Sequence, residues 1–290
     1  MQLSDKELIE FQEKILSWYA QHQRDLPWRQ TRDPYRILIS EVMSQQTQIQ
    51  RVIVKYTAWL ESFPTVQSLA SAKVSDVLAL WSGLGYNRRA LHLKKTAEIV
   101  TEKYSRKFPE TEKELLALPG IGQYTSRALL CFAFNQQIAV VDTNVRKVIL
   151  TQVLKNHSGE QSDSKILQIS DSGQARMTTE KEIEAIAQRL LPQGKAYEWN
   201  QALMDYAGAV LKKEKISIPK QSKFIGSHRY YRGQVLKSLL QQKKIAVQDM
   251  GLLIKKDFTK DDSVWLQKLL KELSDEGFIL VKNDLVSLAS

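Results

Sequence analysis

The sequence predicts a mainly helical protein that ends in a small α+β domain resembling a winged helix. Apolar residues recur at three- and four-residue spacing to about Leu211, and Pro or Gly punctuates the short turns between them. A basic segment at 212–227, interrupted by Pro219 and Gly226, then breaks the helical pattern. We therefore expect a helical core, a basic linker over 212–227 and a C-terminal domain over 228–290.

The spacing of apolar residues also locates the helices of the core. Asp33 is expected to cap one of them, with Pro34 at its first helical position. The polar stretch 155–178 is expected to form a surface loop. The expected core helices span residues 8–21, 35–46, 50–63, 74–81, 88–104, 111–117, 124–134, 144–154, 180–191 and 198–211.

The C-terminal region combines three helical patterns, at 231–242, 247–254 and 263–275, with two apolar runs at 278–281 and 285–288. A Lys-Asn-Asp turn separates the two runs, as in a β-hairpin. Three helices closed by a hairpin predict a winged helix. The last helix carries both acidic and basic residues, so binding of DNA and docking of a protein partner both stay open.

Charge and composition narrow the class of partner. The 290 residues include 42 Lys and Arg against 32 Asp and Glu, a net charge of +10, which favours a polyanion such as DNA, RNA or anionic lipid. No apolar run is long enough to span a bilayer and the N-terminus lacks a secretion signal, so we expect a cytoplasmic protein without a membrane partner. The single Cys131 is expected to be a buried thiol, outside any disulfide or multi-cysteine metal site.

A Pro-Gly-Ile-Gly turn at 119–122 separates two expected helices. A helix that begins at Gln123 would expose backbone N–H groups that can bind a phosphate oxygen. Gly120 and Gly122 would allow close approach of the phosphate, because neither carries a side chain. An ordinary tight connection between two helices is the alternative.

Two carboxylates are candidates for catalysis. Asp142 precedes a helix, so its simplest role is that of an N-cap, but a carboxylate held there can also stabilise a developing positive charge. Glu41 lies on the inward side of the helix at 35–46 and must be paired or protonated. Desolvation raises the pKa of a carboxyl group, which would suit Glu41 to act as a general acid. A buried pair of Glu41 with Arg29 or Arg36 is the alternative.

Several segments, in the same order, resemble landmarks of the helix-hairpin-helix (HhH-GPD) DNA glycosylases, and most closely of the adenine glycosylase branch, the MutY family. They include Leu-Pro-Trp-Arg at 26–29, Ser-Glu-Val-Met-Ser-Gln-Gln-Thr at 40–47, Gly-Leu-Gly-Tyr at 83–86, Leu-Pro-Gly-Ile-Gly at 118–122, Asp-Thr-Asn-Val at 142–145 and Asn-Gln-Ala-Leu-Met-Asp at 200–205. The resemblance covers about Leu26 to Leu211.

The resemblance implies a glycosylase fold of two helical subdomains, one over about 33–142 and one formed by 1–32 with 143–211. It also implies a monomeric, nucleoid-associated enzyme of base excision repair that acts on double-stranded DNA. Such an enzyme would flip a mismatched adenine, opposite 8-oxoguanine or guanine, out of the stack and hydrolyse its N-glycosidic bond.

Roles for individual residues follow from the same resemblance. Glu41 would protonate the purine and Asp142 would stabilise an oxocarbenium-like state, with Tyr124 and Asn144 lining the pocket. The residues expected to touch the adenine are Trp28, Arg29 and Gln201. Those expected to fill the gap or probe the opposing base are Gln45, Gln46, Thr47 and Tyr86. Those expected to bind DNA at the hairpin are Gly120, Gly122, Gln123 and Thr125. Packing of Trp28 and Tyr86 within the fold and solvation of Gln45 and Gln46 are the alternatives.

Three departures from related enzymes qualify these roles. Related enzymes that also cut the strand carry a lysine nucleophile where this chain has Tyr124, so we expect no efficient lyase activity. The stretch 212–220 contains no cysteine where the family binds an iron-sulfur cluster, so no cluster or other cofactor is expected. The lysines there would contact phosphate instead, making affinity dependent on salt. The winged-helix-like region also replaces the family's Nudix-like domain.

Two other functions stay open. Tyr124 with Asp142 also resembles the thymine and uracil glycosylases that act on T:G or U:G mismatches. The segment around Glu41, together with Asn144, favours adenine, because a purine leaving group needs protonation more than a pyrimidine does. A non-catalytic DNA-binding protein would require neither carboxylate.

Overall fold

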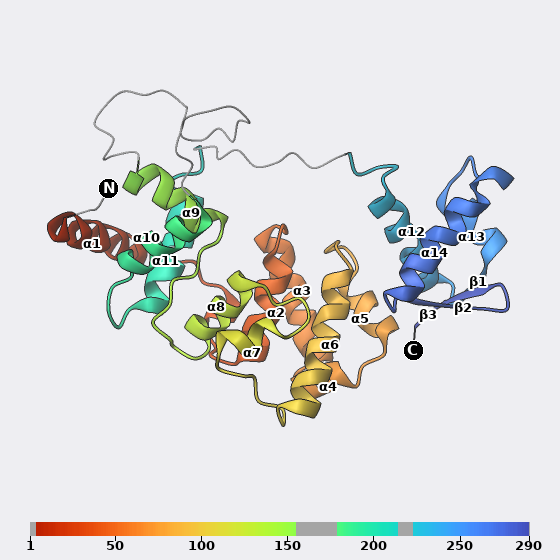
Figure 1. Cartoon of the computed structure of the whole chain (residues 1–290), viewed down its shortest axis with the longest axis horizontal. Helices are drawn as coiled ribbons and strands as arrows, with labels where there is room; N and C mark the ends of the chain where they lie inside the picture. Colours follow the sequence, from red (N-terminus) through yellow and green to blue (C-terminus); the bar gives the residue numbers. More distant parts are fainter. Residues whose placement is uncertain (1–3, 155–178, 214–222, 290) are drawn as a thin grey trace. The chain divides into compact units, whose positions relative to one another are not determined.

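The computed structural model describes residues 4–154, 179–213 and 223–289, and these parts are mainly helical, with one small sheet (Figure 1). The mainly helical fold class with a small C-terminal sheet is thus confirmed. The expected loop at 155–178 lies outside the described residues, as does most of the expected basic linker. None of the helices in the described ranges is long and apolar enough to cross a membrane.

Contacts divide the chain into two compact units. The first unit comprises Met1–Glu41, Pro109–Ala117 and Ile121–Pro219, and the second comprises Val42–Phe108, Leu118–Gly120 and Lys220–Ser290. The subdomain and linker boundaries expected from the sequence stay predictions.

Helix α11 (Ala196–Ala209) is the centre of the first unit and packs against α1 (Asp5–His22) and α9 (Thr143–Val148) (Figure 1). Trp199 of α11 is fully buried, and Phe11 contacts it edge to face. This unit also contains η1 (Pro27–Arg29), α7 (Glu112–Leu116), α8 (Gln123–Phe132), the π-helix η2 (Ile149–Leu154) and α10 (Glu180–Leu190). Helix α2 (Pro34–Ser44) belongs to this unit as far as Glu41.

The second unit contains α3 (Ile49–Ser62), α4 (Val66–Ala70), α5 (Val74–Trp81) and α6 (Arg88–Lys103). Helix α6 packs against α4 and α5, and α5 packs against α3. Trp59 and Trp81, both fully buried, meet edge to face between α3 and α5. This aromatic contact contributes to the apolar core that these helices share.

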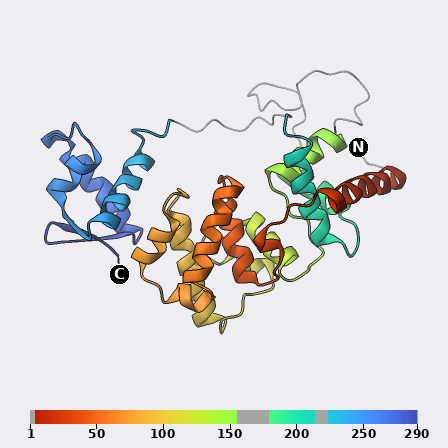
Figure 2. The same ribbon diagram turned by 180° about the vertical axis from the view of Figure 1, so that it is seen from behind.

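The C-terminal part of the second unit has the elements of a winged helix (Figure 2, in blue). Strand β3 pairs antiparallel with both β1 and β2, so the order in the sheet is β1-β3-β2. The elements are α12 (His228–Gln241), β1 (Lys244–Ala246), α13 (Val247–Ile254), η4 (Lys260–Asp262), α14 (Ser263–Asp275), β2 (Ile279–Lys282) and β3 (Leu285–Leu288).

Strong periodic patterns located most elements well. Helices α5, α13 and α14 begin and end where the sequence predicts. Asp33 accepts a hydrogen bond from the backbone N–H of Tyr35 at 2.9 Å, as expected for a cap.

Several short elements were not expected, and the prediction of one helix was partly wrong. The expected single helix at 144–154 is α9 followed by the π-helix η2, and the helix expected at 111–117 ends one residue early, at Leu116. Three further elements, η1, α4 and β1, have three to five residues and were not expected from the sequence. Such lengths are too short for a hydrophobic period, and β1 exists only through its pairing with β3.

The two glycines of the hairpin turn differ in what the fold requires of them. Gly120 has a φ of +75°, and a Cβ placed on it would lie 2.7 Å from Cβ of His92. Gly122 has a φ of −93°, and a Cβ there would meet open space. The fold therefore needs glycine at 120, whereas nothing inside the protein excludes a side chain at 122.

We expect Gly120→Ala to lower the free energy of unfolding by about 1 to 3 kcal/mol, because alanine would be strained there and would collide with His92. The matched substitution Gly122→Ala should leave the free energy of unfolding nearly unchanged. Urea denaturation of both variants measures the difference, and equal losses would contradict this account of the turn.

Candidate active site

The first unit brings together Glu41, near the end of α2, and Tyr124, the second residue of α8. The Tyr124 hydroxyl donates a hydrogen bond of 2.6 Å to Oε2 of Glu41. The two arginines considered as partners bind other carboxylates: Arg29 binds Asp205, and Arg36 lies 3.7 Å from Asp33. The Glu41 carboxyl therefore meets a neutral donor in place of the alternative ion pair.

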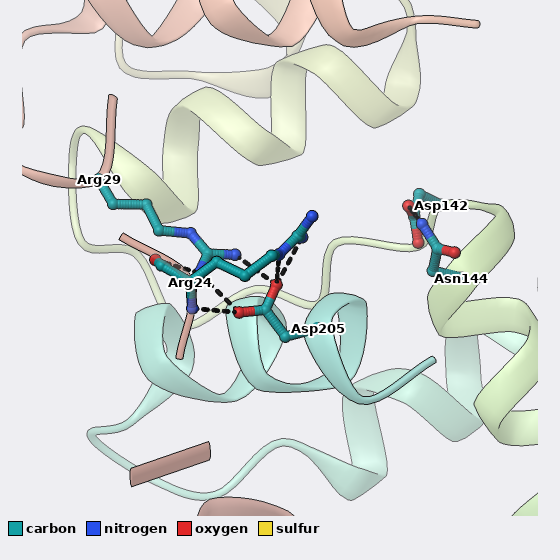
Figure 3. Close-up of polar contacts among 5 residues, drawn as sticks. All are labelled: Arg24, Arg29, Asp142, Asn144 and Asp205. Carbon is teal, nitrogen blue, oxygen red and sulfur yellow. Dashed lines mark hydrogen bonds and ion pairs between the residues drawn. The ribbon is translucent and has the colours of Figure 1, made fainter. Parts of the chain in front are cut away.

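Asp142 caps α9, as its place in the sequence predicts. Its Oδ1 accepts the backbone N–H of Val145 at 2.7 Å, and its Oδ2 accepts Nδ2 of Asn144 at 2.8 Å. Figure 3 shows Asn144 folded back beside Asp142. Burial raises the pKa of Asp142, although the hydrogen bonds from Val145 and Asn144 favour the carboxylate. The cap thus holds both carboxylate oxygens in fixed positions.

The surroundings of Glu41 suit it to proton transfer. Burial raises its pKa to about 7, and the negative charge of Asp142 acts in the same direction. The hydrogen bond from Tyr124 and the positive charge of Arg29 favour the carboxylate and limit the rise. A carboxyl group with a pKa close to neutral can give up a proton and take one back at the working pH.

Tyr124 remains a phenol under the same conditions. Burial, followed by the charges of Glu41 and Asp142, raises its pKa well above the ordinary value. A neutral hydroxyl can donate to the Glu41 carboxylate without adding a charge. Tyr124 is thus hydrogen-bonded to Glu41, Asn144 is hydrogen-bonded to Asp142, and the charge of Asp142 acts on both Glu41 and Tyr124. A catalytic role for these four residues stays a prediction.

A buried ion pair lies on α11 of the same unit. Asp205 accepts Nη1 of Arg29 at 2.7 Å and Nη2 at 2.8 Å, a two-pronged contact, and also accepts Nε of Arg24 at 2.6 Å (Figure 3). The side chains of Asp205 and Arg29 are 1% and 8% exposed. Burial alone would raise the pKa of Asp205, but the hydrogen bonds from both arginines lower it below its usual value.

The expected adenine-contacting residues come from η1 and α11. Trp28 and Gln201 are both buried, and the Tyr197 hydroxyl donates to the backbone oxygen of Arg29 at 3.0 Å. Nε of Arg29 is buried and meets no hydrogen-bond acceptor among the residues that the structure describes. That nitrogen is a donor available to a bound molecule.

The expected gap-filling residues lie in the second unit, where Arg89 contacts two of them, Gln45 and Tyr86. Its guanidinium donates to the backbone oxygens of Gln45 at 2.8 Å and Gly85 at 3.3 Å and lies over the ring of Tyr86. Gln46 and Tyr86 both have positive φ, so each stands at a sharp bend of the backbone. The side chain of Thr47 turns back to donate to the backbone oxygen of Gln45.

The hairpin residues present the start of α8. Gly122 is the N-cap and supplies no side-chain cap, so the first backbone N–H groups of the helix have no cap acceptor. The side chain of Gln123 binds Glu184, and Thr125 is buried. Any anion at this helix end would therefore meet backbone groups.

Three residues of these networks were given no individual role from the sequence: Arg24, Arg89 and Asp205. Asp205 offered a usable signal, because it is an acidic residue on the apolar face of a predicted helix, as Glu41 is. Arg24 and Arg89 offered none, since their partners are distant carboxylates or backbone oxygens.

No group of three or more His, Cys, Asp or Glu side chains in the described parts of the chain is arranged to hold a metal ion. Cys131 is a buried free thiol, as expected, and accepts a hydrogen bond from Asn200 at 3.3 Å. Burial raises the pKa of this thiol to about 12. A thiol in this state is unreactive.

Residues 39–172 match the family model described as the HhH-GPD superfamily of base excision DNA repair proteins. These residues therefore carry an HhH-GPD domain. An adenine DNA glycosylase of Mycobacterium tuberculosis is 43% identical over 140 residues, which is 48% of this chain and 46% of that protein. The adenine DNA glycosylase of Homo sapiens is 36% identical over 213 residues, or 70% of this chain and 36% of that protein. The chain thus spans about half or less of these two relatives.

Two solved structures have a similar fold. A thermostable thymine-DNA glycosylase is 29% identical, with a TM-score of 0.60 over 73% of this chain and 91% of that one. An endonuclease III trapped on DNA has a TM-score of 0.55 at 19% identity, covering 71% of this chain and 86% of that one, a likeness of fold alone. The helix-hairpin-helix glycosylase fold is therefore confirmed for this chain.

We expect Glu41 to make stability dependent on pH. Because its pKa is higher in the folded protein, at about 7, than its ordinary value of 4.5, its favourable contribution is present below pH 4.5 and lost as the pH rises through 7. From pH 5 to pH 8, Glu41→Gln should therefore gain about 2 kcal/mol in unfolding free energy relative to the unmodified protein.

Urea denaturation at each pH measures this gain. Glu61→Gln, at an exposed position of α3, is the matched control and should run parallel to the unmodified protein. If the unfolding free energies of Glu41→Gln and the unmodified protein also change in parallel with pH, the Glu41 carboxyl is already ionised across this range, contrary to the prediction.

Proposed function

We propose that this protein is a monofunctional adenine DNA glycosylase of base excision repair. Its substrate would be an adenine opposite 8-oxoguanine or guanine in double-stranded DNA, flipped from the stack before the N-glycosidic bond is hydrolysed. The observation that carries the proposal is the half-buried Glu41 carboxyl, which accepts a hydrogen bond from Tyr124 and whose pKa is raised by desolvation to about 7.

Protonation is the step that favours a purine. An adenine that leaves as an anion is a poor leaving group, and transfer of a proton from Glu41 lets it depart neutral. The bond between the sugar and the base then breaks with the electron pair going to the base, and positive charge develops on the sugar ring. Tyr124 would hold the Glu41 carboxyl in place throughout.

Asp142 would stabilise that positive charge. Its oxygens are held by the backbone of Val145 and by Asn144, so no reorganisation is needed as the charge appears. Water then adds to the anomeric carbon and releases a proton, which returns Glu41 to its acid form. The reaction needs no redox step, and we propose that it needs no iron-sulfur cluster or other cofactor.

Recognition of adenine would come from η1 and α11. Nε of Arg29 offers a buried donor, and Trp28 and Gln201 are buried in the same unit. We propose that Gln45, Gln46, Thr47 and Tyr86 fill the gap left by the flipped base or probe its partner, with Arg89 holding the backbone of Gln45 and the ring of Tyr86.

Several features support DNA as the partner. The net charge is +10, and the start of α8 offers backbone N–H groups to a phosphate at a position where Gly122 leaves room. We propose phosphate contacts at Gly120, Gly122, Gln123 and Thr125 through the backbone, and a location with the nucleoid. Tyr124 cannot form a Schiff base, so strand cleavage would not follow base excision.

A thymine or uracil glycosylase is the second candidate. It is favoured by the likeness to the thermostable thymine-DNA glycosylase, of which this chain covers 91%. The adenine glycosylase relatives are more similar in sequence, at 36% to 43% identity, although over shorter shares of their length.

We expect excision of adenine from A:8-oxoguanine and A:G duplexes, and none of the pyrimidine from T:G or U:G. Single-turnover reactions with each duplex measure this, with alkali added to cleave at abasic sites. Without alkali the strand should stay intact, because Tyr124 supplies no amine. Excision confined to T:G or U:G would establish the second candidate instead.

We expect Asp142→Asn to slow adenine excision by about a thousandfold or more, because the developing charge would lose its counter-charge. Glu41→Gln should slow it by about a hundredfold to ten-thousandfold through loss of the proton donor. Affinity for the duplex, measured by fluorescence anisotropy, should change little in both variants. A loss of binding as large as the loss of rate would point to a structural role.

A further inference from the structure

Arg89, on α6, joins two backbone segments of the second unit through its guanidinium. Its Nη1 atom donates to the backbone oxygens of Val42 and Gln45, at 2.6 and 2.8 Å. Its Nη2 atom donates to the backbone oxygens of Leu84 and Gly85, at 3.2 and 3.3 Å. One arm of the guanidinium thus holds the end of α2 with the residue after it, and the other arm holds the turn that follows α5.

Two of these four oxygens belong to peptide bonds that lead into strained residues. The oxygen of Gln45 lies in the peptide bond to Gln46, and that of Gly85 lies in the peptide bond to Tyr86. Gln46 has a φ of +56° and Tyr86 a φ of +49°, a left-handed conformation that residues other than glycine rarely adopt. Such a conformation persists only where the surrounding structure fixes it. Arg89 supplies this restraint at both positions.

Backbone oxygens, and not an acidic side chain, compensate the charge of Arg89. Its other contacts in the described parts of the chain are with the rings of Trp81 and Tyr86, whose centroids lie 5.2 and 5.5 Å from the guanidinium carbon. A half-buried guanidinium needs hydrogen-bond acceptors, and release of either segment would take two of them away. Each segment therefore favours the seating of the other.

The strained residues themselves are open to a ligand. Gln46 is exposed, and Tyr86 is 47% exposed. We propose that Arg89 is a positioning residue that joins the end of α2 to the turn after α5, so that Gln46 and Tyr86 act as one rigid reader of the base opposite the excised adenine. This role rests on the proposed glycosylase activity. Arg89 acts through these two residues and does not itself contact the base.

The role requires the forked shape of arginine. The two terminal nitrogens of Arg89 serve one segment each. A lysine carries its three donors on a single nitrogen and lacks the planar fork. Arg89→Lys would therefore keep the positive charge but hold at most one of the two segments.

Hydrogen exchange of the protein without DNA tests the link between the segments. The amides of Thr47 and Leu84 report on one segment each, because they donate to the backbone oxygens of Ser44 and Trp81. In Arg89→Met both amides should exchange faster by about tenfold or more, since each segment loses two hydrogen bonds from a charged group. If only one of the two amides exchanges faster, or neither does, the proposal is overturned.

Two other variants sharpen this measurement. Arg51→Met removes an arginine that reaches only the turn after α5, at the backbone oxygen of Gly83, 3.5 Å away, so exchange at Thr47 should not change. Arg89→Lys should leave at least one of the two amides fast, and it remains informative if Arg89→Met fails to fold. Faster exchange at Thr47 in Arg51→Met, or slow exchange of both amides in Arg89→Lys, would contradict the proposed role of the fork.

Excision rates test the reading of the opposing base. The quantity measured is the ratio of single-turnover rates for adenine opposite 8-oxoguanine and adenine opposite cytosine. The double variant Gln46→Ala with Tyr86→Ala should lower this ratio, and Arg89→Met should lower it by as much, because a misplaced reader is equivalent to a missing one. Adding Arg89→Met to the double variant should lower the ratio little further.

A merely structural role of Arg89 would give a different result. Arg89→Met would then slow excision from both duplexes by the same factor and leave the ratio unchanged, with or without Gln46 and Tyr86. That result would overturn the proposal, as would a double variant whose ratio equals that of the unmodified protein.

The two measurements also separate this proposal from the function on which it rests. If the unmodified protein excises no adenine, the proposed function fails and the reading role fails with it, while hydrogen exchange still decides whether Arg89 joins the two segments. If it excises adenine and Arg89→Met leaves the ratio unchanged, only the role of Arg89 fails.

Discussion

The chemistry of the site depends on one hydrogen bond, from the Tyr124 hydroxyl to the Glu41 carboxyl at 2.6 Å. Burial makes an ionised carboxyl costly, and a cationic partner would remove that cost by fixing the charge. Tyr124 carries no charge, because its own pKa is raised. Its hydroxyl therefore holds the Glu41 carboxyl in place by a hydrogen bond, but it does not stabilise the ionised form as strongly as a cation would. This balance places the pKa of Glu41 at about 7 and makes proton transfer possible near neutral pH.

The remaining charges of the first unit are arranged around that balance. Asp142 is held by the start of α9, where backbone N–H groups and Asn144 take both of its oxygens. Arg29 is held by Asp205 on the central helix α11, with the two side chains almost fully buried. Asp142 and Arg29, the charged residues that act on Glu41, thus each have a partner of their own. Glu41, which must gain and lose a proton, is paired with the neutral hydroxyl of Tyr124.

The match to the HhH-GPD family model and the local geometry of the carboxylates both support the proposed glycosylase activity. The superfamily match covers residues 39–172, which include Glu41, Tyr124 and Asp142. Asp205 and Arg29 lie outside that range, so their pairing comes from the structure alone. The region beyond Lys220 adds a winged-helix-like set of elements, with strand order β1-β3-β2.

The sequence by itself determined the helical class, the approximate position of most helices, the cap at Asp142 and the inward side of Glu41, because these depend on local spacing and capping chemistry. It left open whether Glu41 meets an arginine, and it missed Asp205, β1 and the π-helix η2. Those outcomes depend on which distant side chains meet: Tyr124 reaches Glu41 across 83 positions, and Asp205 reaches Arg29 across 176. Only tertiary packing decides such contacts, since they leave no periodic signal in the chain.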